Sequence, residues 1–196
     1  VLADSHAVAE AAAELIAAEA RRCSAERGRF VLAVSGGRTP AVMLRVLADL
    51  AVPWDSVHIF QVDERVAPLG DPARNLTQLH ECLLAHVPLR PGQVHAMPVE
   101  QADLDSAARG YADVLRAFAG TPPVLDLVHL GLGVDGHTAS LVPGDPSLDT
   151  LGIAQRTIVH TRHYAALPEL VTTTDLLAIV PQMYARTMAA RWPVRV

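Results

Sequence analysis

The segment Phe30-Val31-Leu32-Ala33-Val34-Ser35-Gly36-Gly37-Arg38-Thr39-Pro40 joins an apolar run to a glycine turn. Five consecutive apolar residues predict a strand that is buried on both faces, because a half-exposed strand would alternate apolar and polar residues. The glycine pair breaks this strand. Pro40 suits the first position of a helix, where its missing N–H needs no partner. The segment therefore predicts a strand, a sharp turn and a helix.

Similar units follow along the chain. An alanine-rich helix that Ser5 caps and Gly28 stops is expected before the first strand. The other expected elements are a strand at 57–62, a helix at 76–85 capped by Asn75, a helix at 104–119 and a strand at 124–130. This alternation predicts an α/β protein, a three-layer Rossmann-like fold with a mostly parallel central sheet flanked by helices. No low-complexity linker interrupts it, so residues 1–196 are expected to form a single domain.

Composition narrows the possible partners. The net charge of -5 and the pI near 6.0 give no basic field that would attract a nucleic acid or an anionic membrane, so neither is expected as a partner. All 16 basic residues are arginine, which excludes a Schiff-base lysine and the lysine of an ATP-binding P-loop. Cys23 and Cys82 lack a C-x-x-C spacing and are expected to be reduced thiols. Without a signal-peptide pattern or a long apolar run, the protein is expected to be soluble and cytoplasmic.

Polar residues follow three of the expected strands, at the sheet edge where α/β proteins bind ligands. The turn at 35–39 offers N–H groups at a helix start, which suits a phosphate, although a glycine pair is also an ordinary sharp turn. Asp63-Glu64-Arg65 suits acid chemistry or a hold on an anion, although a solvated charge run has the same composition. Asp135-Gly136-His137-Thr138 places an acid and an imidazole two residues apart. No compact metal-ligand set and no Gly-x-Ser-x-Gly motif occurs, so neither a metal site nor a serine hydrolase is expected.

Together these three motifs resemble those of the 6-phosphogluconolactonase family. The family's S-G-G-S-T-P is similar to residues 35–40, with only Arg38 departing, and its D-E-R and later asparagine are similar to residues 63–65 and Asn75. Its G-x-G-x-D-G-H-T-A-S-L-F-P-G signature resembles residues 131–144, where Val142 replaces the aromatic residue. The related glucosamine-6-phosphate deaminases usually carry D-E-Y, so Arg65 favours the lactonase.

The resemblance implies hydrolysis of 6-phospho-D-glucono-1,5-lactone to 6-phosphogluconate, the lactone step of the pentose phosphate pathway. His137 is then expected to be the general base that activates water, without a metal or an organic cofactor. The expected catalytic residues are His137, Asp135 and Asp63. The expected substrate- or phosphate-binding residues are Ser35, Gly36, Gly37, Arg38, Thr39, Arg65, Asn75, Gly133 and Gly136. The partner is a small phosphorylated sugar lactone, and a monomer or a homodimer is expected.

Beyond Leu151 the sequence departs from the family's pattern. The family's tail carries a lysine near the phosphate, and this chain has none. Residues 163–168 and 175–181 are instead similar to the end of the effector domain of LysR-type regulators, so 151–196 is treated as an atypical C-terminal segment. Arg162 or Arg186 is a candidate for the missing charge, although a solvent-facing role is expected for both. A glucosamine-6-phosphate deaminase/isomerase with Asp63 as base, or a non-catalytic sugar-phosphate-binding protein, therefore stays open as an alternative.

Overall fold

A four-stranded parallel sheet organises the first part of the chain. The structure, a computed structural model, describes residues 4–133, 135–146 and 148. The strands are β1 (Phe30–Val34), β2 (Val57–Gln61), β3 (Val94–His95) and β4 (Leu127–Val128), in the order β3-β2-β1-β4. Leu32 pairs with Ile59 of β2 on one side and with Leu127 of β4 on the other. All five residues of β1 are buried, as its unbroken apolar run predicts.

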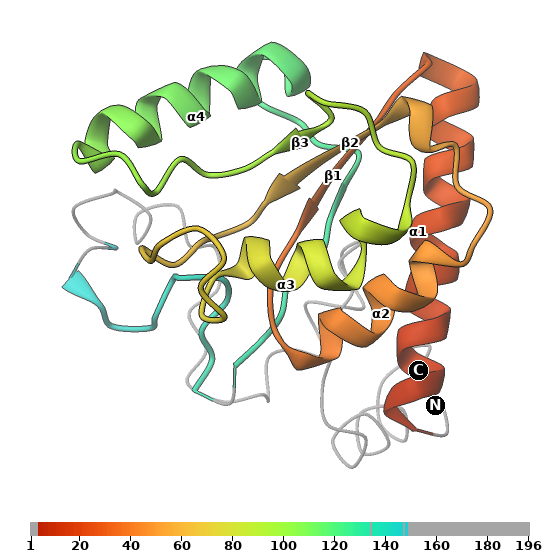
Figure 1. Cartoon of the computed structure of the whole chain (residues 1–196), viewed down its shortest axis with the longest axis horizontal. Coiled ribbons are helices and arrows are strands. Elements are labelled where there is room, and N and C mark those ends of the chain that lie inside the picture. The colour runs from red at the N-terminus through yellow and green to blue at the C-terminus, as the bar shows by residue number, and fades with distance from the viewer. Residues whose placement is uncertain (1–3, 134, 147, 149–196) are drawn as a thin grey trace. The chain divides into compact units, whose positions relative to one another are not determined.

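Helices cover both faces of this sheet and make three layers (Figure 1). Three of them, α1 (Ser5–Arg27), α2 (Arg38–Ala48) and α3 (Asn75–Cys82), pack on one face around the larger core, to which Phe30, Leu32 and Ile59 belong. The helix α4 (Leu104–Ala119) covers the other face through a smaller cluster around Phe60. The short 3-10 helices at 54–56 and 84–86 complete the described elements. The predicted three-layer α/β fold is confirmed.

The chain divides into two compact units, and each is described by itself. One unit is Asp4–Leu130, which holds every helix and strand named above. The other begins at Gly131 and contains a narrow antiparallel bridge between Thr138 and Leu141. The predicted features at 151–196, including Arg162 and Arg186, lie outside the described residues. The single domain over residues 1–196 stays a prediction.

Three helix starts differ from the sequence prediction. Asp4, not Ser5, caps α1, because its carboxylate accepts hydrogen bonds from the backbone N–H groups of His6 and Ala7. The helix α2 begins at Arg38, so Pro40 is its third residue and still lies in the first turn, where an N–H has no helical partner. Asn75 is the first residue of α3 and does not cap it, because its side chain is engaged elsewhere.

The last strand is shorter than predicted. The N–H of Val124 donates to the carbonyl of Ala119, so this residue continues the turn after α4 rather than the sheet. Asp126 then uses its carboxylate to accept the N–H of Val31 at 2.7 Å, a side-chain contact at the start of the pairing. The two-residue strand β3 was not predicted, since a run so short leaves no periodic pattern.

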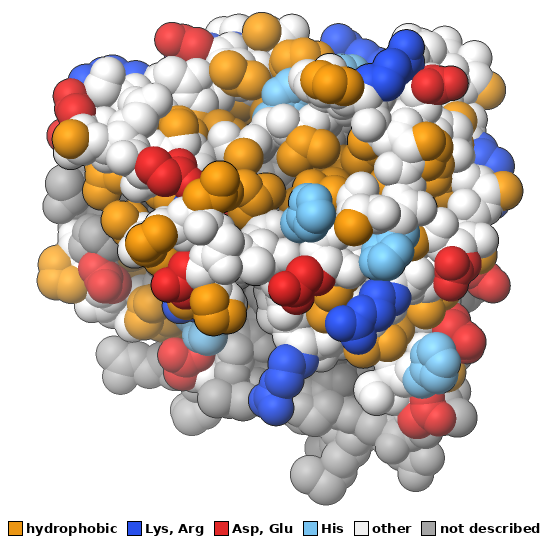
Figure 2. Space-filling model, viewed as in Figure 1, with side chains coloured by type: hydrophobic (Ala, Val, Ile, Leu, Met, Phe, Trp, Pro, Cys, Tyr) orange, Lys and Arg blue, Asp and Glu red, His pale blue; other side chains and the backbone are white. Residues whose placement is uncertain are grey.

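Two further predictions concern the core and the chain's relation to membranes. Cys23 and Cys82 are buried free thiols, as their spacing predicts. Among the described residues, no helix has the length and apolar character needed to cross a bilayer. Charges of both signs are interspersed on the face seen in Figure 2, where the described side chains form no continuous basic area.

Gln93 offers a test of how the edge of the sheet is held. Its buried side chain donates to the carbonyls of Trp54 and Val57 at 2.7 and 2.6 Å and accepts the N–H of Arg90. In Gln93→Leu all three backbone groups lose their bond to this side chain, although the carbonyl of Trp54 still accepts the N–H of Val57. We expect a loss of about 2–4 kcal/mol in the free energy of unfolding, since each buried unsatisfied group costs about 1–3 kcal/mol and some will find water. Urea unfolding measures it.

The matched control is Gln101→Leu, at an exposed position whose side chain bonds to no described residue. It should change the free energy of unfolding by less than about 0.5 kcal/mol, the usual range of surface substitutions. Equal losses in the two variants would contradict the role given to Gln93.

Candidate active site

The glycine turn joins β1 to α2 and exposes helix-start N–H groups. Gly37 precedes α2 in the cap position, so the N–H groups of Arg38 and Thr39 fall in the first helical turn. Neither N–H has an acceptor among the described residues, and Pro40 has no N–H to satisfy. Partial positive charge at a helix start favours an anion, so this turn has the chemistry that a phosphate requires.

Two members of the turn already have side-chain partners. The N–H of Gly37 donates to Oε1 of Gln78 in α3, at 2.7 Å. The hydroxyl of Ser35 lies 3.3 Å from Nδ1 of His129, just beyond β4. Burial lowers the pKa of His129, so this imidazole is neutral near pH 7. Neither Gln78 nor His129 carries a signal in the sequence, because only the tertiary structure brings these two residues to the turn.

Asn75 lies directly over the turn. A Cβ atom added to Gly36 would stand 2.1 Å from Oδ1 of Asn75, far inside van der Waals contact, so only glycine allows this approach. The amide nitrogen of Asn75 donates to the backbone carbonyl of Asp63 at 3.0 Å and to its carboxylate at 3.2 Å. Asn75 therefore links the end of β1 to the loop after β2. A small pocket at this junction includes Ser35, Gly36, Gln61, Asn75 and Gln78 in its lining.

Glu64 is the most strongly bonded carboxylate of this junction. Its side chain is fully buried and accepts hydrogen bonds from Gln61 Nε2 and from the backbone N–H groups of Arg65, Asn75 and Leu76, at 2.7–3.0 Å. Burial alone would raise the pKa of Glu64, but these bonds and the Arg74 guanidinium outweigh it and lower the pKa to about 2. The carboxylate is therefore ionised at neutral pH and closes the N-terminal end of α3.

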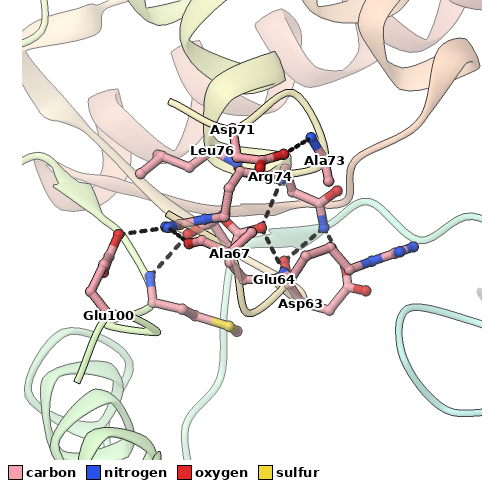
Figure 3. Close-up of polar contacts among 12 residues, drawn as sticks. Asp63, Glu64, Ala67, Asp71, Ala73, Arg74, Leu76 and Glu100 are labelled. Carbon is pink, nitrogen blue, oxygen red and sulfur yellow. Dashed lines mark hydrogen bonds and ion pairs between the residues drawn. The ribbon is translucent and has the colours of Figure 1, made fainter. Parts of the chain in front are cut away.

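Arg74 neutralises this buried charge. Its guanidinium is itself buried, with Nε 3.0 Å from Oε2 of Glu64 and Nη1 2.6 Å from Oε1 of Glu100 (Figure 3). Burial alone would lower the pKa of Arg74, and bonds to the two carboxylates raise it instead. Of the arginines predicted to bind substrate, Arg38 and Arg65 are exposed, and neither guanidinium bonds to another described residue. These two side chains keep their donors for a ligand.

The second unit holds the predicted acid and imidazole. Nδ1 of His137 lies 2.5 Å from Oδ1 of Asp135, and the hydrogen bond from His137 lowers the pKa of this carboxyl. An ionised carboxylate can only accept, so in the neutral imidazole Nδ1 carries the proton and Nε2 has the free lone pair. A Cβ atom on Gly133 would meet the imidazole at 2.2 Å, so the loop closes around the ring only with glycine there. This pair has the arrangement of an oriented general base.

The two predicted glycine N–H groups of this loop are engaged internally. Gly133 donates to the carbonyl of His137 at 2.7 Å, and Gly136 donates to the carbonyl of Gly133 at 3.0 Å. Both N–H groups already have acceptors in this conformation, and the substrate-binding role of these two glycines stays a prediction. Their N–H groups shape the loop.

The predicted site residues thus fall into two groups. Ser35–Thr39, Asp63, Arg65 and Asn75 lie at one end of the sheet in the first unit. Gly133, Asp135, Gly136 and His137 lie together in the second unit. Among the described residues, no cluster of three or more His, Cys, Asp or Glu side chains suits a metal ion. A second hollow, of about 410 Å³ between β3 and α4, is lined by none of the predicted site residues.

The chain is thus an α/β protein with a helix-start turn at the end of a parallel strand in one unit and an acid-oriented histidine in the other. The family model of glucosamine-6-phosphate isomerases/6-phosphogluconolactonase matches residues 3–178, so the chain belongs to this family. The match extends beyond residue 150, where the resemblance by motif ended.

Individual relatives agree with this assignment. The chain is 37% identical over 152 residues to the 6-phosphogluconolactonase of Synechocystis sp., a match that covers 76% of this chain and 63% of that protein. It is 34% identical over 190 residues to the 6-phosphogluconolactonase of Streptomyces coelicolor, covering 90% and 71%. The 6-phosphogluconolactonase structure from Trypanosoma brucei superimposes with a TM-score of 0.66 at 26% identity, covering 75% and 64%. The chain thus spans less than two thirds of the length of the Synechocystis relative.

Gly36→Ala tests the close approach of Asn75 to the turn. The added methyl group would displace the Asn75 amide from Asp63, so we expect a loss of about 1–3 kcal/mol in the free energy of unfolding, as is usual for overpacking. Gly110→Ala is the control, because a Cβ atom at this position of α4 meets nothing within 4 Å. It should gain about 0.5–1 kcal/mol, the usual preference of a helix for alanine. A neutral Gly36→Ala would contradict the packing described.

The low pKa of Glu64 predicts a defined dependence of stability on pH. Its folded pKa, about 2, lies below the ordinary 4.5, so its contribution to stability is full above about pH 4.5 and is lost as the pH falls toward 2. In Glu64→Gln this contribution is absent at every pH. Urea midpoints measured at pH 6, 4 and 3 should therefore converge for wild type and variant as the pH falls. A constant gap would contradict the ionised, bonded state of Glu64.

Proposed function

We propose that the protein hydrolyses 6-phospho-D-glucono-1,5-lactone to 6-phosphogluconate, with His137 as the general base. The observation that carries the proposal is the Asp135–His137 pair, in which the carboxylate fixes the proton on Nδ1 and leaves Nε2 as the basic atom. The names of the relatives support the substrate, and the turn at 35–39 supports a phosphorylated one. In this proposal the reaction belongs to the oxidative branch of the pentose phosphate pathway and takes place in the cytoplasm.

The reaction needs one proton to move twice. Nε2 of His137 takes a proton from water as the water oxygen attacks the lactone carbonyl carbon, and a tetrahedral oxyanion forms. The bond from this carbon to the ring oxygen then breaks, and the imidazolium returns the proton to that oxygen. Asp135 holds the ring throughout and stabilises the imidazolium, as the acid of a hydrolase triad does. The step requires no cofactor.

The first unit supplies the substrate contacts in this proposal. The N–H groups of Arg38 and Thr39 receive the phosphate, and the exposed guanidinium groups of Arg38 and Arg65 add charge-assisted bonds. Asp63, fixed by Asn75, binds sugar hydroxyls. The partner is thus a small phosphorylated lactone, held without a nucleic acid or a membrane, by a monomer or a homodimer in which residues 1–196 form one domain.

His137→Ala tests the proposal. General-base catalysis contributes about 10²–10⁴-fold, so kcat should fall by that factor while the protein stays folded. The assay follows loss of freshly generated lactone by the purified protein, corrected for spontaneous hydrolysis, and circular dichroism confirms the fold. Asp135→Asn should also lower kcat strongly, because an amide no longer fixes the tautomer. The exposed His6 gives the control variant His6→Ala, which should retain wild-type turnover.

Three outcomes would overturn the assignment. Full turnover by His137→Ala would exclude this histidine as the base. Release of ammonia from glucosamine 6-phosphate without lactone hydrolysis would identify a deaminase, the other activity named in the family description. Binding of 6-phosphogluconate by the folded wild-type protein without any turnover would identify a non-catalytic sugar-phosphate-binding protein.

A further inference from the structure

We propose that Glu64, which contacts no substrate in the mechanism above, is a positioning residue that sets Asn75 over the glycine turn and, through Asn75, holds Asp63. The inference rests on the proposed function, since it assigns Glu64 a part in the same site. It differs from the catalytic assignments because Glu64 is fully buried and acts only through its neighbours.

The carboxylate of Glu64 is surrounded by donors. Oε1 accepts the N–H groups of Arg65 and Asn75, at 2.8 and 2.7 Å. Oε2 accepts Gln61 Nε2 and the N–H of Leu76, at 2.9 and 3.0 Å, and pairs with Arg74. Because both oxygens face only donors, an amide in either orientation would set an NH₂ group against them. The position therefore requires a carboxylate rather than merely a polar side chain of this size.

The bonds of Glu64 lead to the proposed substrate contacts. It holds the backbone of Arg65, and it holds the backbone of Asn75, whose side chain in turn holds Asp63 at 3.0 and 3.2 Å. Three of the predicted site residues thus depend on one carboxylate, directly or through Asn75.

A variant at Glu100 can distinguish a positioning role of Glu64 from a contribution to stability alone. Arg74 joins Glu64 to Glu100, but Glu100 contacts none of the predicted site residues and its side chain is half-exposed (Figure 3). Glu100→Gln therefore weakens the outer half of the same ionic cluster and leaves the inner carboxylate bonded. It is the matched control for Glu64→Gln.

A double-mutant cycle tests whether Glu64 acts through Asn75. We expect Glu64→Gln to lower kcat/KM for the lactone at least tenfold, and Glu100→Gln to lower only the thermal midpoint. In an Asn75→Ala background, adding Glu64→Gln should lower kcat/KM by a clearly smaller factor than in wild type, because only its contact with the backbone of Arg65 remains to be lost, while the thermal midpoint still falls. An equal loss of kcat/KM in both backgrounds would overturn the proposal, as would an equal effect of Glu100→Gln.

Hydrogen exchange of backbone amides gives a readout that needs no substrate. The N–H groups of Asn75 and Leu76 should exchange at least tenfold faster in Glu64→Gln than in wild type, while those of β1 keep their protection. Unchanged exchange at Asn75 would overturn the inference even if the wild type hydrolyses the lactone. If the wild type does not hydrolyse it, the proposed function fails, and the exchange result still decides whether Glu64 positions Asn75.

Discussion

The buried ion pair between Glu64 and Arg74 is the contact on which the described end of the sheet depends. Removing two charges from water is costly, and a buried pair repays that cost only when further hydrogen bonds satisfy both groups. Here the carboxylate accepts from four other donors, and Nη1 of Arg74 also donates to Glu100 and to the carbonyl of Ala67, while the buried Nη2 has no hydrogen-bond partner among the described residues. These bonds fix the loop after β2 against α3. The site at this end of the sheet therefore has a rigid base, although its outer arginines are exposed.

The sequence was enough to predict the fold class because its signals are local. The unbroken apolar run of β1, the glycine after α1 and the amphipathic pattern of α4 each specify one element without help from the rest of the chain. The prediction for the start of α3 was wrong because a distant side chain replaced a local one. Asn75 looked like a helix cap, yet Glu64 takes that part from eleven residues away, and no pattern within the helix shows it.

The sequence predicted the motifs of the candidate site but not the hydrogen bonds that connect them. Asp135 and His137 are two residues apart in the sequence, so a contact between them could be predicted from the loop alone. The glycine pair before Pro40 likewise predicted a turn with N–H groups at the start of a helix. The contacts of Ser35 with His129 and of Gly37 with Gln78 join residues 94 and 41 positions apart, which only the tertiary structure brings together. Glu64 belongs to the Asp63-Glu64-Arg65 motif, but its side chain is buried. The motif alone does not show which of its three charged side chains is buried.

The hydrogen bond between Gly37 and Gln78 has a consequence for selectivity. The side-chain oxygen of Gln78 already accepts the N–H of Gly37. A ligand that uses this N–H must therefore displace Gln78. A neutral hydroxyl offers no gain in that exchange, whereas a doubly charged oxyanion does, because charge-assisted bonds are about twice as strong as neutral ones. Gln78 thus favours a charged acceptor over a neutral one at the N–H of Gly37.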